Sequence, residues 1–234
     1  MSDPIPFRRS GSGATGPAPD VRRVVVVSAG LADPSSTGLL ADLLSQATTR
    51  AADARGTAVE VVRIDLRALA HGLTDALLTG FASGDVAEAQ AQVAAADAVV
   101  AVTPVFSASY NGLFKTFFDV LEQGALDGVS VLVGATAGTA RHSLVLDHAL
   151  RPLFAYLRAV VLPTGVFAAS EDWAGEGAGG TAGRTGGSAL RSRIDRAAGE
   201  LVDHLAGPRP RAERLDQFDR DVAAMGSFED LLGG

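Results

Sequence analysis

Four hydroxyl side chains gather around one short loop of the sequence, and their spacing suits the binding of a phosphate group. Ser28 ends an apolar run, and Ser35, Ser36 and Thr37 stand where a helical pattern begins. Hydroxyls, free backbone N–H groups and the positive end of a helix dipole would point the same way there. An ordinary helix N-cap, the alternative interpretation, needs only one hydroxyl. We therefore interpret this loop as a candidate site for a phosphate monoester.

A second loop, residues 103–112, combines small residues with two aromatic side chains, Phe106 and Tyr110. Its length and composition would suit the wall of a pocket for a flat ring, with backbone groups turned toward the ligand. The alternative is a turn that faces solvent while both rings pack on the next helix. Taken alone, the loop leaves the two interpretations equally open.

A third loop contains Thr136, Ala137, Gly138 and Thr139 and is followed by Arg141 and His142. Its small side chains allow a ligand to approach backbone N–H groups closely. The arginine and the histidine could add positive charge. Because turns of small residues are common, this loop is a weak signal by itself.

The sequence offers no pattern for a metal site or for acid–base catalysis. His142 and His148 are six positions apart, so they would face different sides of a helix, and the chain contains 0 cysteines. We predict no metal, and we assign no catalytic side chain because no obvious general acid or base is present.

Short β-branched runs alternate with helical patterns, and this alternation positions the three loops. The expected strands are residues 23–28, 58–64, 98–103, 129–134 and 160–167. The expected helices are residues 37–54, 85–95, 113–122, 142–158 and 189–205, with Pro152 kinking or splitting the fourth near Arg151. Several strands are apolar at nearly every position, as in a parallel sheet covered on both faces. We predict an α/β fold with a doubly wound five-stranded parallel sheet, whose ligands bind beyond the carboxyl ends of the strands.

Composition limits the function and the domain organisation. The formal net charge of −7 argues against nucleic acid or an anionic membrane as the main partner. No apolar run reaches the roughly 18–20 residues of a membrane span, and no signal-peptide core is present, so we expect a cytoplasmic protein. We expect a flexible leader at residues 1–20, one domain at residues 21–206 with a mobile Gly-rich loop at 174–188, and a C-terminal tail at residues 207–234.

Several stretches together carry a family resemblance. They are residues 103–115 (TPVFSASYNGLFK), 134–138 (GATAG), 147–153 (DHALRPL) and 165–167 (GVF). Over about residues 24–173, the chain resembles the flavodoxin-like NAD(P)H-dependent FMN reductases, which supply reduced flavin to partner monooxygenases. The first loop and the tail near Phe228 are most similar to the branch paired with luciferase-like flavin monooxygenases.

The resemblance implies a flavodoxin-like fold and a role for each loop. The FMN phosphate would be held by Ser28, Ser35, Ser36 and Thr37. The flavin ring and ribityl chain would be lined by Pro104, Val105, Phe106 and Ser107, and the other ring edge would face Thr136, Ala137, Gly138 and Thr139. Hydride would pass from nicotinamide C4 to flavin N5, so positioning would be the main contribution of the protein. Many relatives carry an arginine beside the phosphate, and this first loop has none. Either the hydroxyls and the helix dipole suffice, or FMN binds weakly, which would suit an enzyme that treats flavin as a substrate.

Alternatives remain open at this point. An NAD(P)H:quinone or azo reductase would keep FMN bound, a flavodoxin-type electron carrier would lack NAD(P)H activity, and a flavin-free binding module would show neither property. The sequence does not indicate whether NADH or NADPH is preferred.

The resemblance implies a homodimer or homotetramer. Apolar residues that could form either the subunit interface or a well-filled core are Phe114, Phe117, Phe118, Leu153, Phe154 and Leu157.

Overall fold

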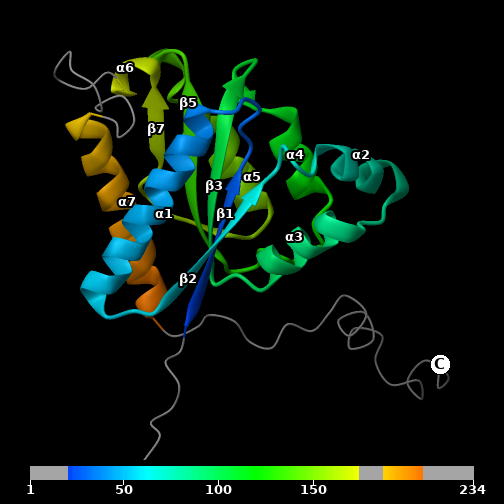
Figure 1. Ribbon diagram of the computed structural model, residues 1–234, viewed down its shortest axis with the longest axis horizontal. Coiled ribbons are helices and arrows are strands. Elements are labelled where there is room, and N and C mark those ends of the chain that lie inside the picture. The colour runs from blue at the N-terminus through cyan, green and yellow to red at the C-terminus, as the bar shows by residue number, and fades with distance from the viewer. Residues whose placement is uncertain (1–20, 174–186, 208–234) are drawn as a thin grey trace, which may run out of the picture.

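The computed structural model describes residues 21–173 and 187–207. The expected leader, nearly all of the Gly-rich loop and the tail beyond residue 207 lie outside the described residues. Helices pack on both faces of a central sheet in the described part of the chain (Figure 1).

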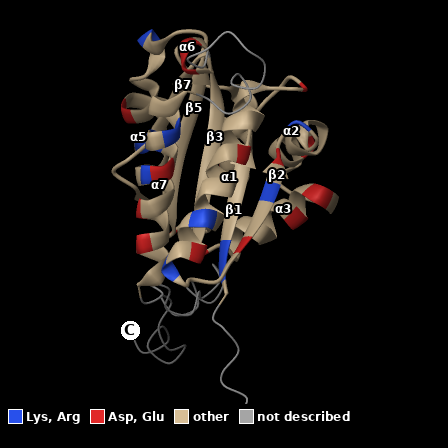
Figure 2. Cartoon of the chain, turned by 60° about the vertical axis from the view of Figure 1, so that its left-hand side comes forward, with Lys and Arg blue, Asp and Glu red and all other residues tan. Residues whose placement is uncertain are grey.

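The parallel strands of the sheet follow the order β2-β1-β3-β5-β6. Their bounds are Arg22–Ser28 (β1), Val59–Asp65 (β2), Ala98–Phe106 (β3), Ser130–Ala137 (β5) and Val160–Val161 (β6). The middle strands β3 and β5 contain no charged residue, and the charges lie on the helices and on strands β1 and β2 instead (Figure 2). This order confirms the predicted doubly wound sheet, and it is the flavodoxin-like one.

The fifth predicted strand, residues 160–167, is interrupted. β6 pairs with the start of β5, and β7 (Val166–Ala169) pairs with its end. Between them, the four residues 162–165 stand opposite two residues of β5. The guanidinium of Arg151 donates to the carbonyl of Leu162 at 2.8 Å, and the hydroxyl of Thr164 donates to Glu200. These two bonds satisfy polar groups of the interruption, while its first residue, Leu162, still donates its backbone N–H to the carbonyl of Val131 in β5 at 2.9 Å.

Two layers of helices cover the sheet. Helices α1 (Ser36–Arg55) and α7 (Ser188–Ala206) pack on one face. The other face is covered by α2 (Ala70–Thr79), α3 (Gly84–Ala94), α4 (Gly112–Asp119) and α5 (Arg151–Tyr156). Helix α2 was not predicted from the sequence, and a short α6 (Ser170–Trp173) follows β7. None of the helices in the described ranges has the length and apolar character to cross a membrane.

The fourth predicted helix changes its hydrogen-bonding pattern along its length. A 3-10 turn (η1, Ala140–His142) and a π-helical turn (η2, Leu146–Leu150) precede α5, which begins at Arg151. Proline lacks an N–H and is tolerated in a first helical turn, where that group has no partner within the helix. The backbone stays helical through Leu150 and Arg151, so the hydrogen bonding changes from π to α near Pro152 without a break in the helix.

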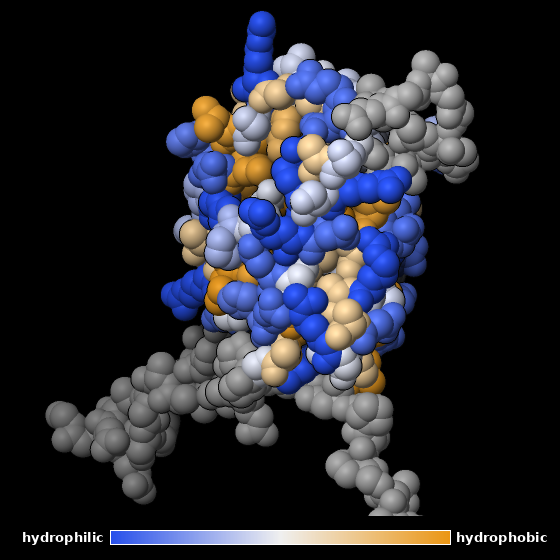
Figure 3. Space-filling model, turned by 90° about the vertical axis from the view of Figure 1, so that its left-hand side faces the viewer, coloured by the Kyte–Doolittle hydropathy of each residue, from blue (hydrophilic) through white to orange (hydrophobic). Residues whose placement is uncertain are grey.

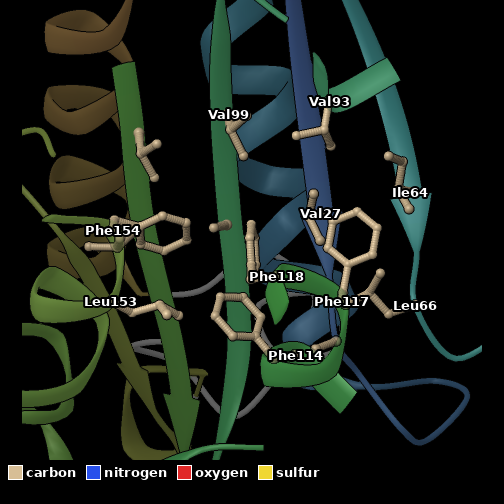
Figure 4. Packing of buried hydrophobic residues seen from close by; sticks show 14 of the residues in the cluster. Val27, Ile64, Leu66, Val93, Val99, Phe114, Phe117, Phe118, Leu153 and Phe154 are labelled. Carbon is tan, nitrogen blue, oxygen red and sulfur yellow. The ribbon is translucent and has the colours of Figure 1, made fainter. Parts of the chain in front are cut away.

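Aromatic side chains fill the core between the sheet and helices α4 and α5 (Figure 4). Phe118 and Phe154 meet edge to face with ring centroids 4.9 Å apart. Phe114 and Phe117 are each 0% exposed within a single chain. Five of the six residues considered for a subunit interface are therefore internal core, and the sixth, Leu157, is half-buried against it. The core interpretation applies to these five residues.

Candidate functional site

The loops after β1, β3 and β5 meet at the carboxyl edge of the sheet, because these parallel strands are neighbours. Ser28 pairs with Val102, and Pro104 pairs with Thr136. In Figure 1 this edge lies at the top of the molecule. The three loops singled out in the sequence therefore form one region.

The loop after β1 closes tightly around Ser35. Its Oγ accepts a hydrogen bond from the N–H of Gly38 at 2.9 Å and thereby caps α1. A Cβ added to Gly30 would lie 2.3 Å from this oxygen, so only glycine leaves room for it. The N–H groups of Ser36 and Thr37 meet no acceptor among the described residues. These donors and the dipole of a 20-residue helix fit a phosphate group.

Ser28 lies beneath this loop, at the end of β1. It is 0% exposed, and its hydroxyl has no hydrogen-bond partner among the described residues. An unpaired buried hydroxyl is destabilising by roughly 1–3 kcal/mol. Ser28 therefore offers hydrogen-bonding capacity that a polar group from outside the chain could use, and this observation also fits a bound phosphate.

Two predicted ligands from different loops contact each other. The hydroxyls of Thr37 and Thr136 lie 2.7 Å apart, and both residues are almost fully buried. One of the two hydroxyls donates its hydrogen to this bond, and the hydrogen of the accepting hydroxyl is then free to be donated to a ligand. The pair therefore joins the first loop to the third, although we had assigned the two residues to different parts of FMN.

The loop after β3 is a β-hairpin. β3 continues beyond its predicted end to Phe106, turns at Ser107 and Ala108, and returns as β4 (Ser109–Tyr110). The φ angles of Ser107 and Ala108 are 48° and 66°. This left-handed conformation costs roughly 1–2 kcal/mol per non-glycine residue.

The two aromatic residues of the hairpin have different environments. Phe106 is 49% exposed near the hairpin tip. Tyr110 is half-buried, and its ring packs against Phe114 with centroids 5.8 Å apart. The alternative of a ring packed on the next helix therefore applies to Tyr110 and not to Phe106. Pro104 and Val105 are half-buried at the base of the hairpin.

The third loop is open to solvent over much of its length. Ala137 is half-buried, whereas Gly138 and Thr139 are exposed. Arg141 and His142 follow on η1 and are also exposed. The backbone of this loop is therefore accessible at the carboxyl edge, as a ligand contact would require.

A positive charge approaches the first loop from β2. The Nη2 atom of Arg63 would lie 3.7 Å from a Cβ added to Gly38. Arg63 is paired with Asp42 and with Asp65, however, and these carboxylates neutralise its charge. No group of three or more potential metal-ligating side chains occurs within the described ranges.

Asn111 also lies at this edge, and it is not among the predicted ligands. It is 1% exposed, and its Oδ1 accepts from the N–H of Phe114 at 2.8 Å, which caps α4. Its amide nitrogen also donates to the carbonyl of Ala29 at 2.8 Å. An Asn before a helical pattern signals an N-cap, but nothing local in the sequence indicates the second bond.

Comparison with known proteins identifies relatives of this chain. Residues 22–174 match the model of the NADPH-dependent FMN reductase family. An NADH-dependent FMN reductase of Pseudomonas putida, SfnF, is 41% identical over 64% of this chain and 79% of its own length. An FMN reductase (NADPH) of Pseudomonas aeruginosa is 36% identical over 64% of this chain and 78% of its own length.

A solved structure agrees with these sequence relationships. An oxidoreductase from Corynebacterium diphtheriae is 49% identical and superposes with a TM-score of 0.72 over 80% of this chain and 97% of that one. The family match covers more than half of the chain and includes all three loops. The chain therefore belongs to the NADPH-dependent FMN reductase family, oxidoreductases that use a nicotinamide nucleotide and FMN.

Proposed function

We propose that this chain reduces free FMN with a nicotinamide nucleotide and releases the reduced flavin to a partner monooxygenase. The observation that carries the proposal is the group of hydroxyls and unpaired N–H groups at the start of α1, which offers many neutral donors to a phosphate. The one guanidinium described beside it is paired with carboxylates. A site that binds the phosphate without an unpaired positive side chain holds FMN less tightly, which suits a flavin that is released after reduction.

The proposed phosphate ligands are Ser28, Ser35, Ser36 and Thr37, together with the backbone N–H groups of the first turn of α1. Ser35 and Thr37 already take part in hydrogen bonds that fix their positions. Ser36 is exposed and can turn toward a ligand. Fixed donors bind an anion without the entropy loss of ordering them first.

The flavin ring has its proposed place between the hairpin and the third loop. Its proposed contacts are Pro104, Val105, Phe106, Ser107, Thr136, Ala137, Gly138 and Thr139. FMN and the nucleotide supply the hydride acceptor and donor. The protein has to hold the two rings face to face, and the backbone N–H groups of the third loop, with Arg141, would stabilise negative charge at the ring edge.

The monooxygenase partner and a homo-oligomeric assembly are also part of the proposal. Both rest on the family resemblance. The side of the molecule that carries α7 is mainly hydrophilic, with apolar residues in small separate groups (Figure 3). We therefore do not place a subunit contact on that side. Light scattering of the purified protein would give the subunit number.

The test is nucleotide oxidation by purified protein, with free FMN titrated from zero and a quinone as a parallel acceptor. We expect NADH or NADPH oxidation to rise from near zero with added FMN and to saturate. A rate that is independent of added FMN but requires quinone would overturn the release of reduced flavin. Absence of nucleotide oxidation with either acceptor would overturn the activity itself.

A further inference from the structure

Asn111 joins three elements at the carboxyl edge of the sheet. It lies immediately before α4, and its backbone N–H donates to the hydroxyl of Thr103 in β3 at 3.2 Å. Its side chain caps α4 and also reaches the carbonyl of Ala29, 82 positions earlier in the sequence. Ala29 follows β1 directly and precedes Gly30, against which Ser35 packs. Asn111 therefore connects the base of the hairpin with the loop around Ser35.

We propose that Asn111 is a positioning residue for FMN, because it fixes the distance between the phosphate loop and the hairpin that lines the flavin ring. The inference rests on the proposed function of these two loops. A bound FMN would span them, so a change in their separation would weaken contacts at one end of the ligand. The expected consequence is a lower affinity for FMN.

The two side-chain bonds of Asn111 can be separated chemically. Capping α4 requires only an acceptor, which serine and aspartate also provide. The bond to Ala29 requires a donor, and an ionised aspartate has none. Asn111→Asp would place a carboxylate oxygen against the Ala29 carbonyl while keeping the cap. Asn111→Ser would keep a cap and leave the Ala29 carbonyl without its partner.

Gln90 provides a matched control at the other end of α4. It lies on α3, and its amide nitrogen donates to the carbonyl of Val120, just beyond the C-terminal end of α4, at 2.6 Å. The bond has the same chemistry, an amide donor on a backbone carbonyl. Gln90→Glu removes it with an equally conservative change. Gln90 has no contact with either loop in the proposed site among the described interactions.

The experiment measures the FMN dissociation constant by flavin fluorescence, the thermal midpoint, and kcat at saturating FMN for four proteins. These are the wild type, Asn111→Asp, Asn111→Ser and Gln90→Glu. We expect both Asn111 variants to bind FMN about tenfold more weakly, with kcat reduced much less. We expect Gln90→Glu to lower the thermal midpoint and to bind FMN like the wild type.

Three results would overturn the inference while leaving the proposed function intact. One is FMN affinity within about twofold of the wild type in both folded Asn111 variants, where we expect a tenfold loss, or about 1.4 kcal/mol. Another is an equal loss of affinity in Gln90→Glu, which would indicate a general effect of loosening α4. A third is failure of both Asn111 variants to fold while Gln90→Glu folds. A wild-type protein that neither binds nor reduces FMN would overturn the proposed function, and this inference with it.

Discussion

The two edges of the sheet differ in the exposure of their polar side chains, which are buried at the carboxyl edge and partly exposed at the amino edge. Among the described residues, the buried polar side chains are Ser28, Thr37, Thr48, Thr103, Asn111 and Thr136, and all except Thr48 lie at the carboxyl edge. At the amino edge, polar groups form partly exposed ion pairs, such as Arg23 with Glu60 at 3.1 Å. Exposed pairs add little to stability, and buried polar groups are destabilising unless they are paired. At the carboxyl edge four of the five buried polar side chains are hydrogen-bonded, and only the Ser28 hydroxyl has no partner among the described residues. The buried polar groups are therefore concentrated, and mostly paired, at the edge where we place the ligand.

Among the substitutions considered, Gly30→Ala should have the largest effect on stability and on FMN affinity. The new methyl group would overlap the oxygen of Ser35, so Ser35 would move and release its bond to Gly38. Loss of a cap and overpacking together should lower the free energy of unfolding by about 1–3 kcal/mol. FMN affinity should fall at least tenfold, or by about 1.4 kcal/mol.

Gly112→Ala is the control for this change, because a Cβ at Gly112 meets no atom within 4 Å. Urea unfolding and FMN titration of both variants would show the difference. Equal FMN affinity in the two variants would contradict the placement of the phosphate at Ser35.

Thr37→Val and Thr136→Val should each leave one buried hydroxyl without its partner. Each single change should lower the free energy of unfolding by about 1–2 kcal/mol. The double variant should be more stable than the sum of the single effects predicts, because an apolar pair leaves no orphaned hydroxyl. Its FMN affinity should stay low, since the donor hydrogen is lost. Recovery of both stability and affinity would show that the pair has no contact with the ligand.

Ser28→Ala should separate stability from binding. Removing an unpaired buried hydroxyl should leave the free energy of unfolding unchanged or raise it by up to about 1 kcal/mol. FMN binding should weaken by a few-fold. Thr48→Val makes the same kind of change on α1, where the Thr48 hydroxyl is also buried and unpaired. It should gain stability without any change in FMN affinity, and matching FMN affinities in the two variants would refute a ligand role for Ser28.

Asp203→Asn should have the smallest effect, far from the site. The hydrogen bond from the Arg55 guanidinium holds the pKa of the Asp203 carboxyl below its ordinary value of 3.8. A carboxylate with a lowered pKa stabilises the fold above that ordinary value, and the contribution disappears as the pH falls through the lower, folded-state value. The thermal midpoints of wild type and variant should therefore differ slightly at neutral pH and converge in strong acid, with FMN affinity unchanged. A difference in thermal midpoint that persists in strong acid would mean that the Arg55–Asp203 pair does not cause it.

The sheet could be predicted from the sequence because its strands are continuous apolar runs. Val24 to Val27 and Ala98 to Val102 are fully buried, and such runs need cover on both faces. The position of the loops at one edge then followed from the topology. Helix α2 was missed because its ten residues include Gly72 and lack a capping side chain.

The internal contacts of the site could not be predicted in the same way. The Thr37–Thr136 and Asn111–Ala29 bonds connect positions 99 and 82 residues apart, and nothing in the local pattern marks either one. The hairpin could not be predicted from the sequence because Ser107 and Ala108 are not typical residues for a turn with positive φ. Local patterns therefore located the loops, and only the folded chain shows how they are held together.

The central claim is that the start of α1 binds the FMN phosphate. The most direct test compares the dissociation constants of FMN and riboflavin, which differ only by this phosphate, under identical buffer and salt conditions. The account predicts that FMN binds at least about tenfold more tightly than riboflavin, since charge-assisted hydrogen bonds from several donors are lost without the phosphate. Equal dissociation constants for the two flavins would contradict it.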